Sequence, residues 1–168
     1  GTNTINANST LSFEFNIHSY VTYEEFQIYG YLIVGYDANG NKYVNRLTID
    51  KAYGGNNLGG NTNNANINLT NGNINTLFGG GKKASTTSAT TSIQNVTINK
   101  GIYGGGDEAE VNTVNLNINN STVGSSANNG VIYGGGNAAK VNNTLELNIN
   151  KTNVYGTIYG GGNAGQVT

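Results

Sequence analysis

The sequence predicts an all-β protein, built as a solenoid of stacked coils with an atypical N-terminal region. Three observations predict it: an aromatic-glycine motif that recurs at coil-length intervals, alternating strands between the motifs, and a composition poor in helix formers. The 168 residues include 26 Gly and no Pro, Cys, Met or Trp, and only 10% are charged, whereas about 25% is usual. The apolar residues are mainly Ile, Val, Leu and Tyr, which suit a pleated and half-buried surface.

An aromatic residue followed by at least two glycines recurs through the second part of the chain. Successive aromatics are 25, 25, 30 and 26 residues apart, which is the length of a solenoid coil rather than of a hairpin meander. Rings at equivalent positions are expected to stack as an internal ladder, and the glycines to form a corner without conflict at Cβ. The residues predicted to form this ladder are Tyr53, Phe78, Tyr103, Tyr133 and Tyr159.

Alternating segments such as Leu116–Asn119 and Leu147–Asn150 lie between the motifs. The alternation puts Ile, Leu and Val on one face and Asn or Thr on the other. Stacking the coils about 4.8 Å apart buries the apolar face, and Asn residues at equivalent corners are expected to form amide ladders. The long interval of 30 residues predicts a loop insertion at Gly124–Gly130, and the Thr/Ser-rich run Ser85–Ser92 predicts a second variable loop.

The few charged residues after the glycines support the same register. Lys82–Lys83 in one coil correspond to Asp107–Glu108 in the next, and Glu110 corresponds to Lys140 one coil later. Opposite charges on adjacent strands attract each other. The alternative is a coincidence among a small number of charges.

The motif reads Tyr-Gly-Gly-Gly-Asn at Tyr133–Asn137 and Tyr159–Asn163, and Asp107 replaces the Asn once. The arrangement resembles the right-handed parallel β-helices of pectin-lyase-like and adhesin-type proteins. In particular, it is similar to repeats of large surface proteins of Gram-positive gut bacteria. The resemblance covers residues 52–168 and implies a right-handed parallel β-helix of about four to five coils. It also implies an extracellular place on a bacterial cell surface, as a fragment of a longer protein.

Residues 1–51 form a separate, Tyr-rich region. Seven of the 11 Tyr lie within residues 1–53, and Asn39-Gly40 between the segments Gln27–Tyr36 and Lys42–Ile49 is a hairpin signal. The region is interpreted as a cap over the open end of the solenoid, or as irregular first coils with a hairpin insertion. It is also interpreted as a binding surface, because Tyr is common at recognition hot spots, and the structural and binding interpretations can both hold. The residues proposed for ligand binding are Tyr23, Tyr29, Tyr31, Tyr36 and Tyr43.

The composition argues against several kinds of chemistry. A net charge of −1 and a pI of about 5.7 favour neither nucleic acid nor an anionic membrane as partner, and no apolar run is long enough for membrane insertion. Without Cys and with His18 as the only His, neither a zinc site nor a catalytic triad is expected. Glu24 and Glu25 are neighbours, so in a strand they point to opposite faces. We therefore expect no enzyme activity and no cofactor.

Two functions remain from different classes. The first is a non-catalytic adhesin segment that binds a host glycan or a host protein such as an immunoglobulin. The second is a purely structural stalk that carries a binding domain located elsewhere. A carbohydrate-active β-helix enzyme is a more distant alternative, because it needs two carboxylates converging in one groove. The open strand edge of the last coil also predicts end-to-end self-association.

Overall fold

The computed structural model describes residues 32–36, 42–45 and 48–168, with side chains from residue 49 onward. The described residues form strands and no helix. The strands are β1 (Leu32–Tyr36), β2 (Lys42–Asn45), β3 (Thr48–Tyr53), β4 (Thr62–Phe78), β5 (Thr86–Tyr103), β6 (Val111–Asn119), β7 (Thr122–Val123), β8 (Gly130–Tyr133), β9 (Val141–Asn150), β10 (Asn153–Val154) and β11 (Gly156–Tyr159).

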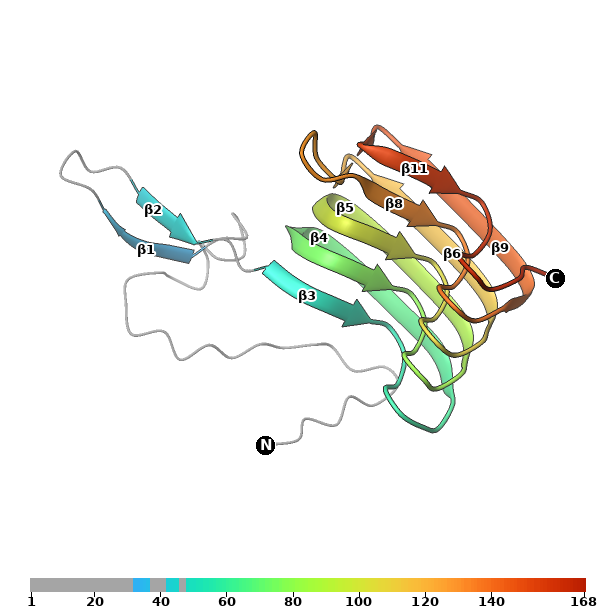
Figure 1. The fold of residues 1–168 in the computed structure, drawn as a ribbon. Coiled ribbons are helices and arrows are strands. Elements are labelled where there is room, and N and C mark those ends of the chain that lie inside the picture. The colour runs from blue at the N-terminus through green and yellow to red at the C-terminus, as the bar shows by residue number, and fades with distance from the viewer. Residues whose placement is uncertain (1–31, 37–41, 46–47) are drawn as a thin grey trace.

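Strands β3 to β11 stack in parallel as a β-solenoid of about four turns, which confirms the predicted fold class. Each coil lies beside the previous one, as the succession of ribbon colours from green to red shows (Figure 1). β4 and β5 each follow a coil as one long strand, whereas the next two coils are divided into β6, β7 and β8 and into β9, β10 and β11. The repeat of 25 to 30 residues is therefore one coil of the solenoid.

The core consists of apolar side chains that lie above one another in successive coils. Leu77 pairs with Ile102, Ile102 with Ile132, and Ile132 with Ile158. The first three are 0% exposed, and burying such a side chain contributes about 1.5–3 kcal/mol. From Val114 to Asn119 in β6 the buried and partly exposed residues alternate, as the period of two in the sequence predicts.

The predicted variable loop at Ser85–Ser92 is wrong, because Thr86 to Ser92 belong to β5. Thr86 pairs with Thr62 and Ser92 with Asn68 in the preceding coil. Thr86 and Thr91 are each only 1% exposed, so their side chains face the interior. Thr is β-branched and fits a strand well, which composition alone did not reveal.

The glycines after each aromatic residue are required because the coils approach each other closely there. A Cβ on Gly104 would collide with the carbonyl oxygen of Gly134 and would lie 2.7 Å from Val114 Cγ1. Backbone hydrogen bonds join the turns, including Gly79 N to Tyr103 O at 2.9 Å and Gly104 N to Tyr133 O at 3.0 Å. Direct backbone stacking thus leaves no room for a side chain.

A second corner of the coil uses the left-handed backbone conformation. Asn71, Asn95, Asn120 and Lys151 have φ values of 64°, 57°, 45° and 46°. Their neighbours pair across successive coils, so the four residues occupy one position of the repeat. Asn adopts this conformation more readily than most residues, and this explains its use at the corner. The amide ladders form at other positions.

The N-terminal strands β1 and β2 form an antiparallel pair, in agreement with the hairpin signal at Asn39-Gly40. In this pair Leu32 is opposite Asn45 and Tyr36 is opposite Lys42. β3 belongs to the solenoid instead, because it pairs in parallel with β4. The sequence boundary at Ala52 therefore falls inside β3.

Candidate functional site

The five aromatic residues of the repeat stack in one column along the solenoid. Their ring centroids are 4.8 Å apart from Tyr53 to Phe78 and from Phe78 to Tyr103, and 5.1 Å and 4.7 Å apart at the next two steps to Tyr133 and Tyr159. The ring planes are nearly parallel, with angles between 5° and 10°. The rings therefore follow the spacing of the coils.

This aromatic ladder lies on the outside of the strands and not in the interior. Phe78 is 3% exposed, the rings of Tyr53, Tyr103 and Tyr133 are half-buried, and Tyr159 is 46% exposed. The apolar core contains the preceding residues, such as Ile102 and Ile132, and none of the rings. Because successive side chains of a strand alternate between faces, an inward Ile turns the next aromatic residue outward.

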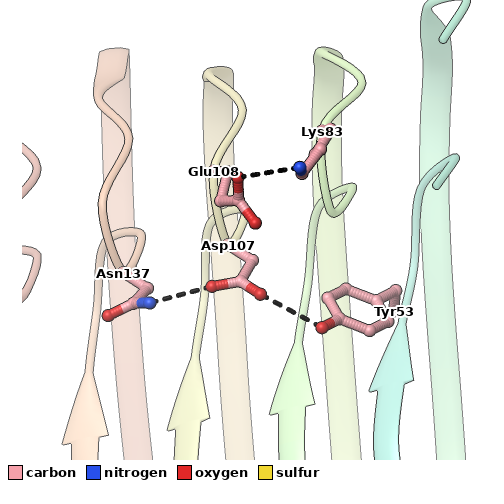
Figure 2. A network of polar contacts seen from close by, with 5 residues as sticks. All are labelled: Tyr53, Lys83, Asp107, Glu108 and Asn137. Atoms are coloured by element: carbon pink, nitrogen blue, oxygen red, sulfur yellow. Dashed lines mark hydrogen bonds and ion pairs between the residues drawn. The ribbon is translucent and has the colours of Figure 1, made fainter. Parts of the chain in front are cut away.

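A polar network follows the glycines beside this ladder (Figure 2). Asp107 is 8% exposed and accepts hydrogen bonds from the hydroxyl of Tyr53 at 3.1 Å and from Nδ2 of Asn137 at 2.8 Å. Asn163 Nδ2 in turn donates to Asn137 Oδ1 at 2.9 Å. The hydroxyl of Tyr133 donates to Asn163 Oδ1 at 3.0 Å. The polar network thus connects the aromatic ladder to the loops after the glycines.

The charged residues of these loops meet in the predicted register. Lys83 Nζ lies 3.5 Å from Glu108 Oε2, and both side chains are about half exposed. Such an exposed ion pair contributes about 0–1 kcal/mol. Glu110 lies beside Lys140, since Val111 N bonds Lys140 O at 3.0 Å, but its carboxylate accepts a hydrogen bond of 3.1 Å from Asn142.

The surroundings of the ladder also affect the acidity of two phenols. Burial of the ring, followed by the hydrogen bond to Asp107 and by its charge, raises the pKa of Tyr53 to about 12. Burial is also the main cause that raises the pKa of Tyr103, with a smaller effect of Tyr133 and Asp107. The hydroxyl of Tyr53 therefore stays protonated at neutral pH and acts as a hydrogen-bond donor, which suits a structural role.

The outer side of β4, β5, β6 and β9 carries rows of amide and hydroxyl side chains, and we call it the amide face. Within it, Asn117 Nδ2 donates to Asn115 Oδ1 at 2.7 Å and Asn148 Nδ2 donates to Asn117 Oδ1 at 3.0 Å. Glu146 accepts hydrogen bonds from Asn115 at 3.2 Å and from Asn148 at 2.9 Å. The rows in register are Asn66, Thr90, Asn115 and Glu146; Asn68, Ser92, Asn117 and Asn148; and Thr70, Gln94, Asn119 and Asn150.

Most of the tyrosines proposed for ligand binding are not located by the structure. Tyr23, Tyr29 and Tyr31 lie outside the described residues. Tyr36 ends β1, and Tyr43 lies in β2 opposite Gly35.

For the amide face, the alternating sequence pattern predicts Asn and Thr on the outer side of the strands. The hydrogen bonds of Glu146 depend on the coil register, and no short motif in the sequence signals them.

Among residues 49–168, no three metal-binding side chains come together. The carboxylates of Asp107 and Glu108 form hydrogen bonds or ion pairs with neighbouring side chains of the solenoid. In this part of the chain no helix is long and apolar enough to cross a membrane.

Comparison with known proteins gives no further assignment. No protein-family model matches the chain, and neither a curated protein nor a solved structure matches it.

Proposed function

We propose that the chain is a non-catalytic segment of an extracellular bacterial surface adhesin, which binds a host glycan or a host protein such as an immunoglobulin. The amide face carries this proposal. It offers hydrogen-bond donors and acceptors in rows about 4.8 Å apart, across several coils. Amide and hydroxyl groups both donate and accept, so they suit the hydroxyl groups of a sugar or the backbone of a protein loop.

The rigidity of the solenoid supports binding by this surface. The core side chains are buried between coils, and the glycine turns stack without space for Cβ atoms. On the amide face, the side chains of Asn115, Asn117, Asn148 and Glu146 are already held by hydrogen bonds to each other. A surface that is ordered before binding loses less conformational entropy when the ligand arrives.

A structural stalk is the second candidate, and the last coil favours it. Tyr155, Ile158, Tyr159 and Val167 are between 42% and 47% exposed there. A further coil or a second copy of the chain stacked on this end would cover them, as the middle coils are covered. End-to-end association therefore fits a spacer, which extends the surface protein and does not itself bind a ligand.

A binding screen distinguishes the two candidates. We would test the chain against a host glycan array and a panel of secreted host proteins, including immunoglobulins. The amide-face variant Asn117→Ala/Asn148→Ala and the N-terminal variant Tyr29→Ala/Tyr31→Ala are measured beside it. Asn57→Ala is the matched control, because Asn57 is an exposed amide next to a glycine turn.

Loss of a ligand in the amide-face variant, with binding retained in the control, supports the proposal as stated. Loss only in the tyrosine variant keeps the adhesin function and moves the binding surface to the N-terminal region. If the chain binds nothing at micromolar concentration, the adhesin proposal fails and the stalk is the better account.

A further inference from the structure

A row of hydrogen-bonded side chains runs across β3, β4 and β5, in the part of β4 and β5 that follows the left-handed corner at Asn71 and Asn95. Asn75 Nδ2 donates to Asp50 Oδ1 at 3.0 Å, and Asn99 Nδ2 donates to Asn75 Oδ1 at 2.8 Å. Both amides donate in the same direction, so their polarisation adds along the row. Asn99 Oδ1 is the acceptor end of the row, and no described residue donates to it.

The row stops at Gly124, which has no side chain. Gly124 N bonds Ile98 O at 2.7 Å and thereby occupies the position next to Asn99 in the following coil. The insertion predicted from the sequence leaves the coil at this point and returns at Gly130, whose N bonds Tyr155 O at 2.7 Å. Ser125 and Asn128 exchange backbone hydrogen bonds of 2.7 and 3.2 Å, so the exposed loop has a defined shape.

A bulge in β5 adds a cation at the same place. Ile98 pairs with Ile74, whereas Gly101 pairs with Thr76, so β5 contains one residue more than β4 between these pairs. Bulges often redirect a side chain toward a site, and here the bulge includes Lys100. Its Nζ lies 3.9 Å from Asp50 Oδ1, and the two side chains are 69% and 73% exposed. An ion pair this long and exposed is weak, so the ammonium group is accessible.

The row, the bulge and the insertion together surround an open cavity of about 480 Å³. This volume is typical of small-ligand sites, which are mostly lined by apolar side chains. The lining residues here carry four amides and one ammonium, so every lining side chain ends in a polar group. Amides bind hydroxyl groups, and an ammonium group attracts an anion and repels a metal cation. The lining residues are Asn75, Asn99, Lys100, Asn128 and Asn129.

We propose that this cavity, which we call the corner cavity, binds an acidic sugar of a glycan, that is, a sugar ring that carries a carboxylate. Lys100 pairs with the carboxylate, and Asn99 Oδ1 accepts a hydrogen bond from a ring hydroxyl. Asn128 and Asn129, on the inserted loop, contact the remaining hydroxyls. The inference rests on the proposed function, because it names the ligand class and a defined site for the same adhesin segment.

The test is a calorimetric titration of the whole chain with glucuronic acid and with N-acetylneuraminic acid. The methyl ester of each acid and glucose are titrated in parallel, since the esters keep the hydroxyls and remove the negative charge. We expect one of the two acids to bind at least about tenfold more tightly than its ester, the effect of losing one charge-assisted hydrogen bond. We also expect this binding to weaken as salt is added. Equal affinity for acid and ester, or no binding of either acid, overturns the proposal.

Three variants locate the site. Lys100→Gln should weaken binding of the acid about tenfold, whereas Lys140→Gln, at an exposed lysine next to a glycine turn, should leave it unchanged. Asn128→Ala/Asn129→Ala changes only exposed loop side chains and tests the site independently of any effect of Lys100 on folding. Unchanged affinity in both cavity variants overturns the proposal. If such variants still bind a host ligand in the screen above, the adhesin function stands without this site.

Discussion

Two sides of each coil, the glycine turns and the side around Gly124, differ in how far successive coils depart from one another. At the glycine turns the backbones of neighbouring coils are in direct contact, and the turns that follow Phe78, Tyr103 and Tyr133 are built alike. On the side around Gly124, the same coils differ by a bulge and by an insertion of several residues. Close backbone stacking thus keeps these three turns alike, whereas the side around Gly124, where side chains point outward, can acquire a loop. The candidate binding cavity lies on the variable side.

The largest expected loss of stability comes from adding a Cβ at a glycine turn. Gly104→Ala should lower the free energy of unfolding by about 2–4 kcal/mol, because the new methyl group meets the carbonyl oxygen of Gly134 and Val114. Gly160→Ala is the matched control in the last coil, where a Cβ would have no atom within 4 Å. Urea unfolding followed by circular dichroism measures both. Equal stability of the two variants would show that the coils do not stack as closely as described.

The polar network beside the ladder predicts a loss of stability at alkaline pH. The pKa of Tyr53 is raised from 10.0 to about 12 in the folded chain, so the folded state retains this proton when the unfolded state has lost it. The resulting stability is complete below pH 10 and disappears as the pH rises from about 10 to about 12. After allowance for solvent screening of the half-buried ring, we expect about 1 kcal/mol, or about 2–4 °C in Tm.

Tyr53→Phe provides the comparison for this pH dependence. The variant lacks the ionisable group, so the Tm advantage of the original chain over it should shrink across that pH range. A constant difference between pH 9 and pH 12 would contradict the raised pKa of Tyr53, whose largest cause is burial of the ring, followed by the hydrogen bond to Asp107.

A stabilising effect of similar size is expected under the glycine turns. The Oγ1 of Thr91 is buried without a hydrogen-bond partner, and Ile67 and Leu116 occupy the equivalent positions of adjacent coils. Thr91→Val keeps the shape and removes the unpaired hydroxyl, so we expect a gain of about 1 kcal/mol. Thr90→Val, on the outer side of the same strand, should give a smaller gain. Thermal unfolding of both variants tests the difference.

The smallest effect is expected on the variable side. Asn128→Ala/Asn129→Ala should change the stability by less than about 0.5 kcal/mol, because both side chains are exposed in the inserted loop. Urea unfolding under the conditions used for Gly104→Ala makes the two sides directly comparable. A loss above 1 kcal/mol would mean that the loop is part of the folded core of the coil.

Equal spacing in the sequence concealed two compensating differences between coils. The intervals from Tyr53 to Phe78 and from Phe78 to Tyr103 are both 25 residues. The first coil has a longer loop containing Gly60, with φ of 77°, and the second has the bulge at Lys100. Counting residues between motifs cannot separate a longer loop from a longer strand. The position of Lys100 in the corner cavity therefore could not be predicted from the spacing of the motifs.

The sequence by itself determined the coil length, the inward position of Ile, Leu and Val, the stacking partners of the aromatic residues and the place of the insertion. These follow from local periodicity, which repeats with every coil. Only the tertiary structure decided that the ladder lies outside the core, that Thr86 to Ser92 form a strand, and that Lys100, Asn99 and Asn128 line one cavity. These features depend on the register between coils, where one extra residue turns the following side chains to the other face.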